Sequence, residues 1–304
     1  MSPRADLPRP INGVQFAAAA RRRRSIGHRH ASNWIMSGVL GMAAIVATLP
    51  LLFILGHLIR EGATSIDLNF FTQIPRPVGQ PGGGMAHAIV GTLILVGLAS
   101  AIGLPIGIGA GLYLAEQGGN RLATTVRFLS DVLNGLPSIV MGIFAWQFLV
   151  RPVGHFSALA GGVALGAMMI PLVTRATEEM VRTVPDSLRE AALALGYPRW
   201  RTSVSIVLRT ALPGIVTAAL VAIARIAGET APLLFTVLGN SFFSVALDQP
   251  IQALPLQIYR YAIQPYDESH RLAWAGALVL IGLVLVISVL ARVVTRSRYR
   301  GSGD

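Results

Sequence analysis

Long hydrophobic segments recur along the chain, separated by short polar ones. The first, residues 34–59, has 26 residues without any Asp, Glu, Lys or Arg. A helix needs about 20 apolar residues to cross the hydrocarbon layer of a bilayer. Five further segments are predicted to be spans of this kind: 88–115, 132–150, 156–174, 212–238 and 272–294. The pattern therefore predicts an all-α membrane protein with six transmembrane helices.

The polar segments divide the chain into three parts. Residues 1–33 form a basic tail that is predicted to be flexible, 34–296 form the transmembrane domain, and 297–304 form a second tail. Several prolines within the predicted spans indicate kinked helices that pack against protein rather than lipid, among them Pro105, Pro137, Pro171 and Pro232.

The arginines are unevenly distributed between the two sides of this topology. With both termini on one side, that side holds 19 of the 25 basic residues, six of them between Arg175 and Arg209, and the other side holds five. Membrane proteins concentrate Arg in cytoplasmic segments. We therefore predict a multi-pass membrane protein with both termini in the cytoplasm. The same distribution explains the net charge of +11 without a nucleic-acid partner.

The composition excludes several chemistries. Only 13% of the residues are charged, and the chain has neither cysteine nor lysine. A Walker A loop needs a lysine to reach the nucleotide phosphates, so any ATP must bind to another chain. The six histidines are scattered, and no nucleophile and base are spaced as a catalytic pair. We predict no enzyme activity, no metal and no cofactor in this chain.

Two long segments face the outer side in this topology, 60–87 and 239–271. The second carries Phe242, Phe243, Tyr259, Tyr261 and Tyr266. Aromatic side chains in such segments belong either to the interfacial belt of the membrane or to a surface that docks an outside partner. Residues 250–265 are predicted to hold a short interfacial helix.

The cytoplasmic segment 175–211 is amphipathic. Asp186 is placed to cap a helix with Arg189 and Glu190 on its polar face, and Gly196 and Pro198 then force a break. The segment predicts a helix, a sharp turn and a second helix that project from the membrane. Such a hairpin can insert into a groove of a partner protein; the alternative is a solvated linker between spans.

The same segment carries a resemblance to a known family. Glu190, Ala191, Ala192, Gly196, Ile206 and Leu208 match the EAA loop of binding-protein-dependent ABC importer permeases, although Arg209 stands where the family has proline. IARIAGETAPLLFTVLGN (223–240) and NGLPSIVMGIF (134–144) are similar to PstA-type permease subunits of phosphate importers. The resemblance covers roughly residues 34–296 and implies the type I ABC importer permease fold.

The resemblance implies a function and a set of partners. The chain is expected to form half of the translocation path of an ATP-driven phosphate importer in the bacterial inner membrane, beside a homologous second permease subunit. Two ATPase subunits would carry ATP and Mg²⁺ and bind the EAA loop. A periplasmic phosphate-binding protein would deliver the substrate. The residues expected to couple to the ATPase are Glu190, Ala191, Ala192, Gly196, Tyr197 and Arg199.

Arg225 lies deep within a predicted span. It lies 13 residues from either end of segment 212–238, which corresponds to about 20 Å of helix on each side. A charge at this depth costs about 2.5–3.5 kcal/mol, so Arg225 should face a polar path or a partner. Glu229, four residues later, would share its helix face. The pair lines an anion path, where a guanidinium matches phosphate oxygens, or it is a static ion pair that holds helices together.

Arg175 and Glu178 form a second candidate on the substrate path. The resemblance implies that an arginine and an acidic residue at this position contribute to transport; for Arg175 the alternative is anchoring at the cytoplasmic side. Three rival functions stay open: a permease for another oxyanion such as sulfate or molybdate, an ion-coupled secondary transporter, and a membrane anchor or sensor scaffold.

Overall fold

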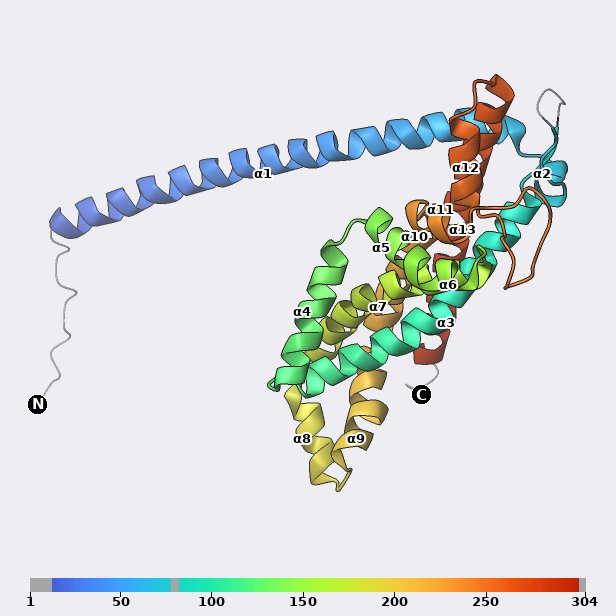
Figure 1. The fold of residues 1–304 in the computed structure, drawn as a ribbon. Coiled ribbons are helices and arrows are strands. Elements are labelled where there is room, and N and C mark those ends of the chain that lie inside the picture. The colour runs from blue at the N-terminus through green and yellow to red at the C-terminus, as the bar shows by residue number, and fades with distance from the viewer. Residues whose placement is uncertain (1–12, 78–81, 301–304) are drawn as a thin grey trace, which may run out of the picture. The chain divides into compact units, whose positions relative to one another are not determined.

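The computed structural model describes residues 13–77 and 82–300, and helices are its only regular elements. The prediction of an all-α chain is confirmed (Figure 1). Residues 1–12 and 301–304, which belong to the predicted tails, lie outside the described range. The helices are α1 Gly13–Gly62, η1 Ala63–Ser65, α2 Leu68–Thr72, α3 Ala86–Glu116, α4 Arg121–Gly135, α5 Ser138–Ala145, η2 Trp146–Val150, α6 Arg151–Val153, α7 Ala158–Arg182, α8 Asp186–Ala194, α9 Arg199–Thr202, η3 Ser203–Val207, α10 Leu208–Ala227, α11 Ala231–Thr236, α12 Leu254–Ala262 and α13 Asp267–Arg300.

The chain divides into two units, Met1–His57 and Leu58–Asp304. In the first unit, α1 is helical from Gly13, so residues 13–33 of the predicted tail continue the helix of the first span. The side chains of residues 32–57 are exposed within this chain. A helix that is apolar on all sides needs lipid or another protein around it. This agrees with a membrane span.

Among the described residues, five helices are long and apolar enough to cross a membrane, or six if one bent pair is counted as a span. The bent pair replaces the predicted span 132–150, whose boundaries were wrong. α4 begins at Arg121, where the Asn120 side chain accepts a hydrogen bond from Ala123 N. The chain then turns by 106° before α5. Leu136 is extended because it precedes Pro137, and this ends α4. Asp131 and Asn134 lie inside α4.

The predicted continuous span 212–238 is broken as well. α9, η3 and α10 form one helical run that ends at Ala227, and residues 228–230 separate it from the short α11. Gly228 caps α10, and Pro232, which has no N–H to donate, sits in the first turn of α11. Helices broken at membrane depth occur where the free backbone is buried in protein or lines a cavity.

The core of the second unit is the contact between α3 and α7. Gly103, Gly107 and Gly111 follow one face of α3 at intervals of four residues and touch Met169, Val173 and the backbone at Thr174 of α7. Small residues at this spacing let membrane helices approach closely. Leu95, Ala99, Leu165 and Val173 are buried in the same cluster. The α3–α7 pair is therefore a closely packed unit.

This contact gives a stability prediction. A Cβ on Gly111 would lie 2.5 Å from the Thr174 carbonyl oxygen, a backbone atom that cannot move aside, whereas a Cβ on Gly109 meets nothing within 4 Å. We expect Gly111→Ala to destabilise the purified protein by about 1–3 kcal/mol through overpacking and to lower its melting temperature in detergent. Gly109→Ala is the matched control. Equal melting temperatures for the two variants would contradict the close contact.

The predicted helix within 250–265 is confirmed as α12, and one of its faces is buried within the chain. Leu254 and Leu256 are fully buried, and Leu254 N donates to Thr92 Oγ1 of α3 at 2.8 Å. One face of α12 therefore belongs to the core. The other face carries Tyr259, which is exposed.

Candidate functional site

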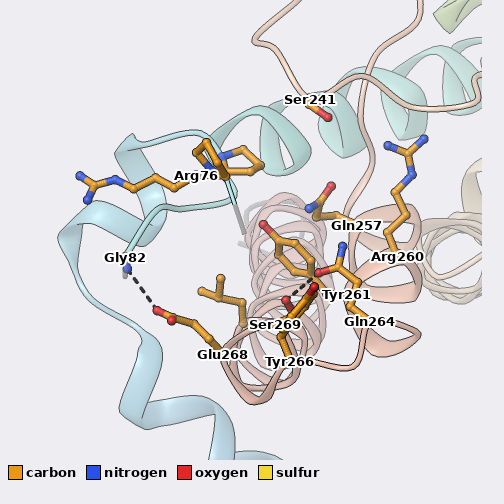
Figure 2. Close-up of a pocket in the computed structure, with 13 residues that line it drawn as sticks. Arg76, Gly82, Ser241, Gln257, Arg260, Tyr261, Gln264, Tyr266, Glu268 and Ser269 are labelled. Carbon is orange, nitrogen blue, oxygen red and sulfur yellow. Dashed lines mark hydrogen bonds between the residues drawn. The ribbon is translucent and has the colours of Figure 1, made fainter. Parts of the chain in front are cut away.

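A polar cavity of about 240 Å³ lies between α12, the start of α13 and the loop residues 75–77, 82 and 241. Figure 2 shows that the guanidinium groups of Arg76 and Arg260 point away from its centre, where Tyr261 and Gln257 lie. Glu268 accepts a hydrogen bond from Gly82 N at 3.2 Å and ties the loop to α13. Burial raises the pKa of the Tyr261 phenol, which keeps it protonated. The cavity is thus a neutral polar recess at its centre.

The aromatic side chains of segment 239–271 do not form one surface. Phe242 and Phe243 are strongly exposed, Tyr259 and Tyr266 are also exposed, and Tyr261 is buried. α12 and the start of α13, which line the cavity, lie at the end of the second unit remote from α8 and α9 (Figure 1).

Glu178 on α7 is the most deeply buried carboxylate among the described residues, with a side chain only 2% exposed. The α3–α7 contact causes this burial, because Gly111 lies directly against the backbone N of Glu178. A buried carboxylate must be paired or it would be expelled or neutralised. Glu178 forms ion pairs with three arginine side chains.

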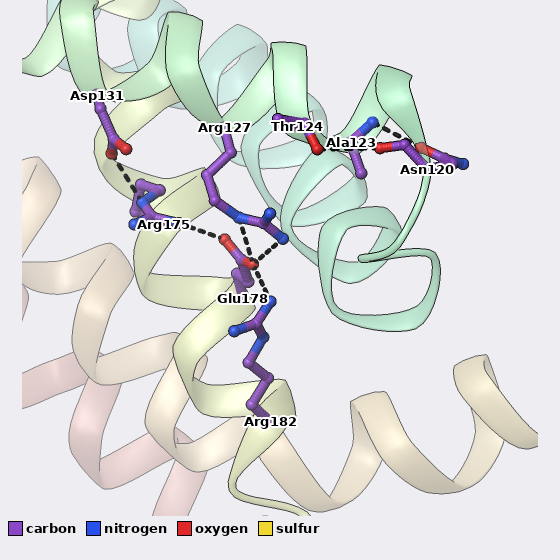
Figure 3. Close-up of polar contacts among 8 residues, drawn as sticks. All are labelled: Asn120, Ala123, Thr124, Arg127, Asp131, Arg175, Glu178 and Arg182. Atoms are coloured by element: carbon purple, nitrogen blue, oxygen red, sulfur yellow. Dashed lines mark hydrogen bonds and ion pairs between the residues drawn. The ribbon is translucent and has the colours of Figure 1, made fainter.

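Three arginines converge on this carboxylate (Figure 3). Arg127 of α4 donates to Oε1 from Nε at 3.0 Å and from Nη2 at 2.7 Å. Arg182 reaches the same oxygen at 2.7 Å, and Arg175 reaches Oε2 at 2.6 Å. Arg175 also pairs with Asp131 of α4 at 2.9 Å. We call these five residues the Glu178 cluster.

The cluster joins α4 to α7. Asp131 and Arg127 lie one turn apart on α4, while Arg175, Glu178 and Arg182 follow one face of α7. Three guanidinium groups face two carboxylates, which leaves an excess of one positive charge. The guanidinium side chains are 24% (Arg127), 32% (Arg175) and 54% (Arg182) exposed. The arginines are therefore open to water and the carboxylate is not.

The sequence-predicted pair Arg175 and Glu178 is thus brought together, whereas Arg127, Asp131 and Arg182 were missed. Arg182 lies at i+4 from Glu178, a spacing that could have been noticed. Arg127 and Asp131 are about 50 residues away in sequence, and only the packing of α4 on α7 brings them near. Guanidinium groups that bind a carboxylate in this way have the geometry to bind a phosphate oxygen.

Arg225 lies near the break between α10 and α11. Its Nε is 3.9 Å from Glu229 Oε1, a loose pair, and its side chain is 56% exposed against 18% for Glu229. Glu229 follows the end of α10, so the predicted placement of both residues on one helix face was wrong. Arg225 also lines a small cavity with Asn134 and Leu136 at the α4–α5 bend. Gly142 of α5 contacts Pro232 of α11, so the two broken helices meet beside Arg225.

The predicted projecting hairpin is formed by α8 and α9, residues 186–202, and extends beyond the other helices of its unit (Figure 1). Its turn is a Schellman motif. Gly196 has φ +85°, Tyr197 N donates to Ala192 O, and Gly196 N donates to Leu193 O. Glycine is favoured at Gly196 because a side chain strains this conformation. We call residues 186–202 the α8–α9 hairpin.

The residues predicted to contact an ATPase lie on this hairpin with different exposures. Glu190, Ala191, Gly196, Tyr197 and Arg199 are exposed, and Ala192 is buried. Leu195 and Trp200 add exposed apolar surface at 78% and 70%, and Arg201 lies over the Tyr197 ring. Two details differ from the sequence-based expectation. Pro185 occupies the capping position instead of Asp186, and Arg189 turns inward, with a side chain only 21% exposed.

Among the described residues, no group of three or more His, Asp or Glu side chains is arranged to hold a metal ion. The charged groups that the structure gathers are arginines and their carboxylate partners. This combination suits the handling of anions.

Comparison with known proteins decides the family. Residues 103–299 match the family described as binding-protein-dependent transport system inner membrane component. The chain is 47% identical over 258 residues to the phosphate transport system permease protein PstA of Yersinia pestis, covering 84% of this chain and 88% of that one. It is 42% identical over 265 residues to PstA of Haemophilus influenzae, covering 87% and 94%. The chain belongs to the PstA family of ABC transporter permeases.

Solved structures support the fold of this family member. A bacterial alginate ABC transporter in complex with an alginate-bound periplasmic protein aligns with a TM-score of 0.65 and 16% identity, covering 88% of this chain and 96% of that one. At this identity the likeness concerns the fold alone. The predicted type I ABC importer permease fold is confirmed, and the family is one of membrane transport components, with no enzyme activity of its own.

Proposed function

We propose that this chain forms half of the translocation path of an ATP-driven phosphate importer of the bacterial inner membrane. The observation that carries the proposal is its identity of 42–47% with phosphate transport permeases over most of its length. The arginine-rich sites described above supply the chemistry that such a substrate requires. The ATPase, with its ATP and Mg²⁺, resides on partner subunits, because the chain has no lysine for a Walker A loop.

The α8–α9 hairpin is the proposed contact for one of two ATPase subunits. It combines exposed apolar side chains and arginines with a glycine turn at its tip. A projecting amphipathic hairpin of this kind fits a groove of a partner. Glu190, Ala191, Gly196, Tyr197 and Arg199 are available for that contact, and Ala192 supports the hairpin from its buried side.

Arg225 is the proposed binding site for phosphate within the membrane. Its guanidinium is exposed in the isolated chain and only loosely held by Glu229, so an anion can replace part of that interaction. The neighbouring side chains of α4 and α5 include exposed apolar residues such as Leu133, Ile139 and Ile143. In the proposed assembly a homologous second permease subunit covers this face and completes the path.

The Glu178 cluster is proposed to act next along the path, towards the cytoplasm. The distribution of arginines supports an orientation with both termini and the hairpin in the cytoplasm. The opposite end, with Phe242, Phe243 and the polar cavity, then faces the periplasmic phosphate-binding protein. No ion gradient enters this scheme, because the motor is the ATPase at the hairpin.

The proposal is tested by uptake in cells that lack their own phosphate importer. We expect expression of this chain with its partner subunits to restore accumulation of radiolabelled phosphate and to leave sulfate and molybdate uptake unchanged. ATP depletion should stop uptake, whereas an uncoupler that spares ATP should not. Restoration of sulfate uptake alone would favour the permease for another oxyanion. Uptake by this chain without an ATPase would favour a secondary transporter.

A further inference from the structure

Glu116, the last residue of α3, holds both arms of the α8–α9 hairpin. One carboxylate oxygen, Oε1, accepts a hydrogen bond from Arg189 of α8. The other, Oε2, accepts one at 2.9 Å from the hydroxyl of Ser203, in the first turn after α9. Glu116 is 73 residues from Arg189 and 87 from Ser203 in the chain. A single side chain at the end of α3 thus contacts both arms of the hairpin, α8 through Arg189 and the end of α9 through Ser203.

Arg189 extends this connection to the other core helix. Its Nη2 donates to the carbonyl oxygen of Val181 at 3.2 Å, in the last turn of α7. Its partner Asp186 lies on the same arm, at 3.6 Å from Nε, with a side chain 90% exposed. The side chains of Arg189 and Glu116 are only 21% and 25% exposed. An ion pair shielded to this degree is screened less by water and salt than an exposed pair, which favours a fixed position of the two side chains.

The two helices reached by this connection are those of the closely packed α3–α7 pair. The glycine contacts at Gly103, Gly107 and Gly111 prevent α3 and α7 from sliding independently, since side chains already fill the space between them. α7 carries Glu178, Arg175 and Arg182. A movement imposed on the ends of α3 and α7 therefore reaches the Glu178 cluster without passing through the membrane-crossing part of α10.

We propose that Glu116 is the positioning residue that couples the α8–α9 hairpin to the α3–α7 pair. It holds the two arms of the hairpin through Arg189 and Ser203, so that displacement of the hairpin moves α3 and α7 as one body. The inference rests on the proposed function, because the displacement comes from the ATPase. In this proposal Glu116 acts through Arg189 and Ser203 and not by binding substrate or nucleotide.

The test is made on the complex purified through a tag on this chain and reconstituted with the phosphate-binding protein. For Glu116→Gln we expect normal co-purification of the ATPase and continued ATP hydrolysis, with phosphate transport per ATP reduced about tenfold. Arg189→Gln should have a similar effect, and the double variant should be no worse than either single one. Asp186→Asn, which removes the exposed carboxylate near the same arginine, is the matched control and should transport normally.

A direct measurement separates coupling from stability. The chain has no cysteine of its own. Cysteines introduced at Leu195 in the hairpin and at Ile106 on α3 are therefore the only sites of this chain that take a spin label, and the distance between the two labels can be measured. With Glu116 in place, the distribution of distances between the labels should be narrow and unchanged when ATP binds. In Glu116→Gln this distribution should broaden.

Three outcomes would decide against the coupling role. They are additive losses in the double variant, full transport by Glu116→Gln, and an unchanged distance distribution with a lowered melting temperature, which would show a merely structural role. If the ATPase fails to co-purify with the unmodified chain, the proposed function itself is wrong.

Discussion

Replacing Glu178 by Gln should abolish phosphate uptake and destabilise the protein. The substitution keeps the volume of the side chain but removes the charge that Arg127, Arg175 and Arg182 share. Breaking a fully buried ion pair typically costs about 3–5 kcal/mol. We expect about 2–3 kcal/mol here, because water still reaches the three arginines and compensates part of the loss.

Uptake should fall further than this stability loss explains, by more than about 30-fold, since α4 is no longer held to α7 and an excess of positive charge retains the anion. Radiolabelled phosphate uptake, normalised to the amount of folded protein in the membrane, is the measurement. The adjacent Glu179 is exposed, so Glu179→Gln is the matched control and should be close to normal. Normal uptake by Glu178→Gln would remove the cluster from the mechanism.

Replacing Arg225 by Gln should abolish uptake with little change in stability. Its side chain is 56% exposed within this chain, and its pairing with Glu229 at 3.9 Å is loose, so its loss should cost no more than about 1 kcal/mol of folding free energy. Transport should fall by about 100-fold, a loss comparable to that caused by removing a hydrogen-bond donor that stabilises an oxyanion.

Two further variants distinguish the anion path from the static ion pair. Arg225→Lys keeps the positive charge but lacks the planar fork of donors, and we expect it to retain weak uptake with a raised KM. Arg151, which binds only Gln147 at an exposed position among the contacts described, supplies the control Arg151→Gln. A large loss of stability with proportionate loss of uptake in Arg225→Gln would favour the static pair.

The broken helices show how far local patterns reach. Hydropathy located every hydrophobic segment, and the ends of 88–115 agree with α3 to within two residues. It failed at 132–150 and 212–238, because a hydropathy window averages over the few residues where the chain turns. Pro137 and Pro232 were recognised as interruptions, but whether a proline kinks a helix or separates two depends on its neighbours. Here Gly142 packs against Pro232 and holds the two breaks together.

The candidate sites also differ in how far apart in the sequence their interacting residues lie. Arg225 with Glu229 was predicted because the two residues lie within about one helical turn of chain, and Arg175 with Glu178 because the resemblance marks that position. The hairpin was predicted because Gly196 and Pro198, which interrupt its helix, lie close together in the sequence. Arg127, Asp131 and Glu116 act through partners 44 to 87 residues away, and no local pattern marks them.

The order of apolar and charged residues by itself determined that this chain is a helical membrane protein with a projecting hairpin and an arginine within a predicted span. These features depend on residues that are neighbours in the sequence, because long apolar runs favour burial in lipid and local turn residues end helices. Which charges meet was decided only by the tertiary structure. The glycines of α3 allow α7 to come close enough to enclose Glu178, and an enclosed carboxylate must draw its counter-charges from whichever helices lie beside it.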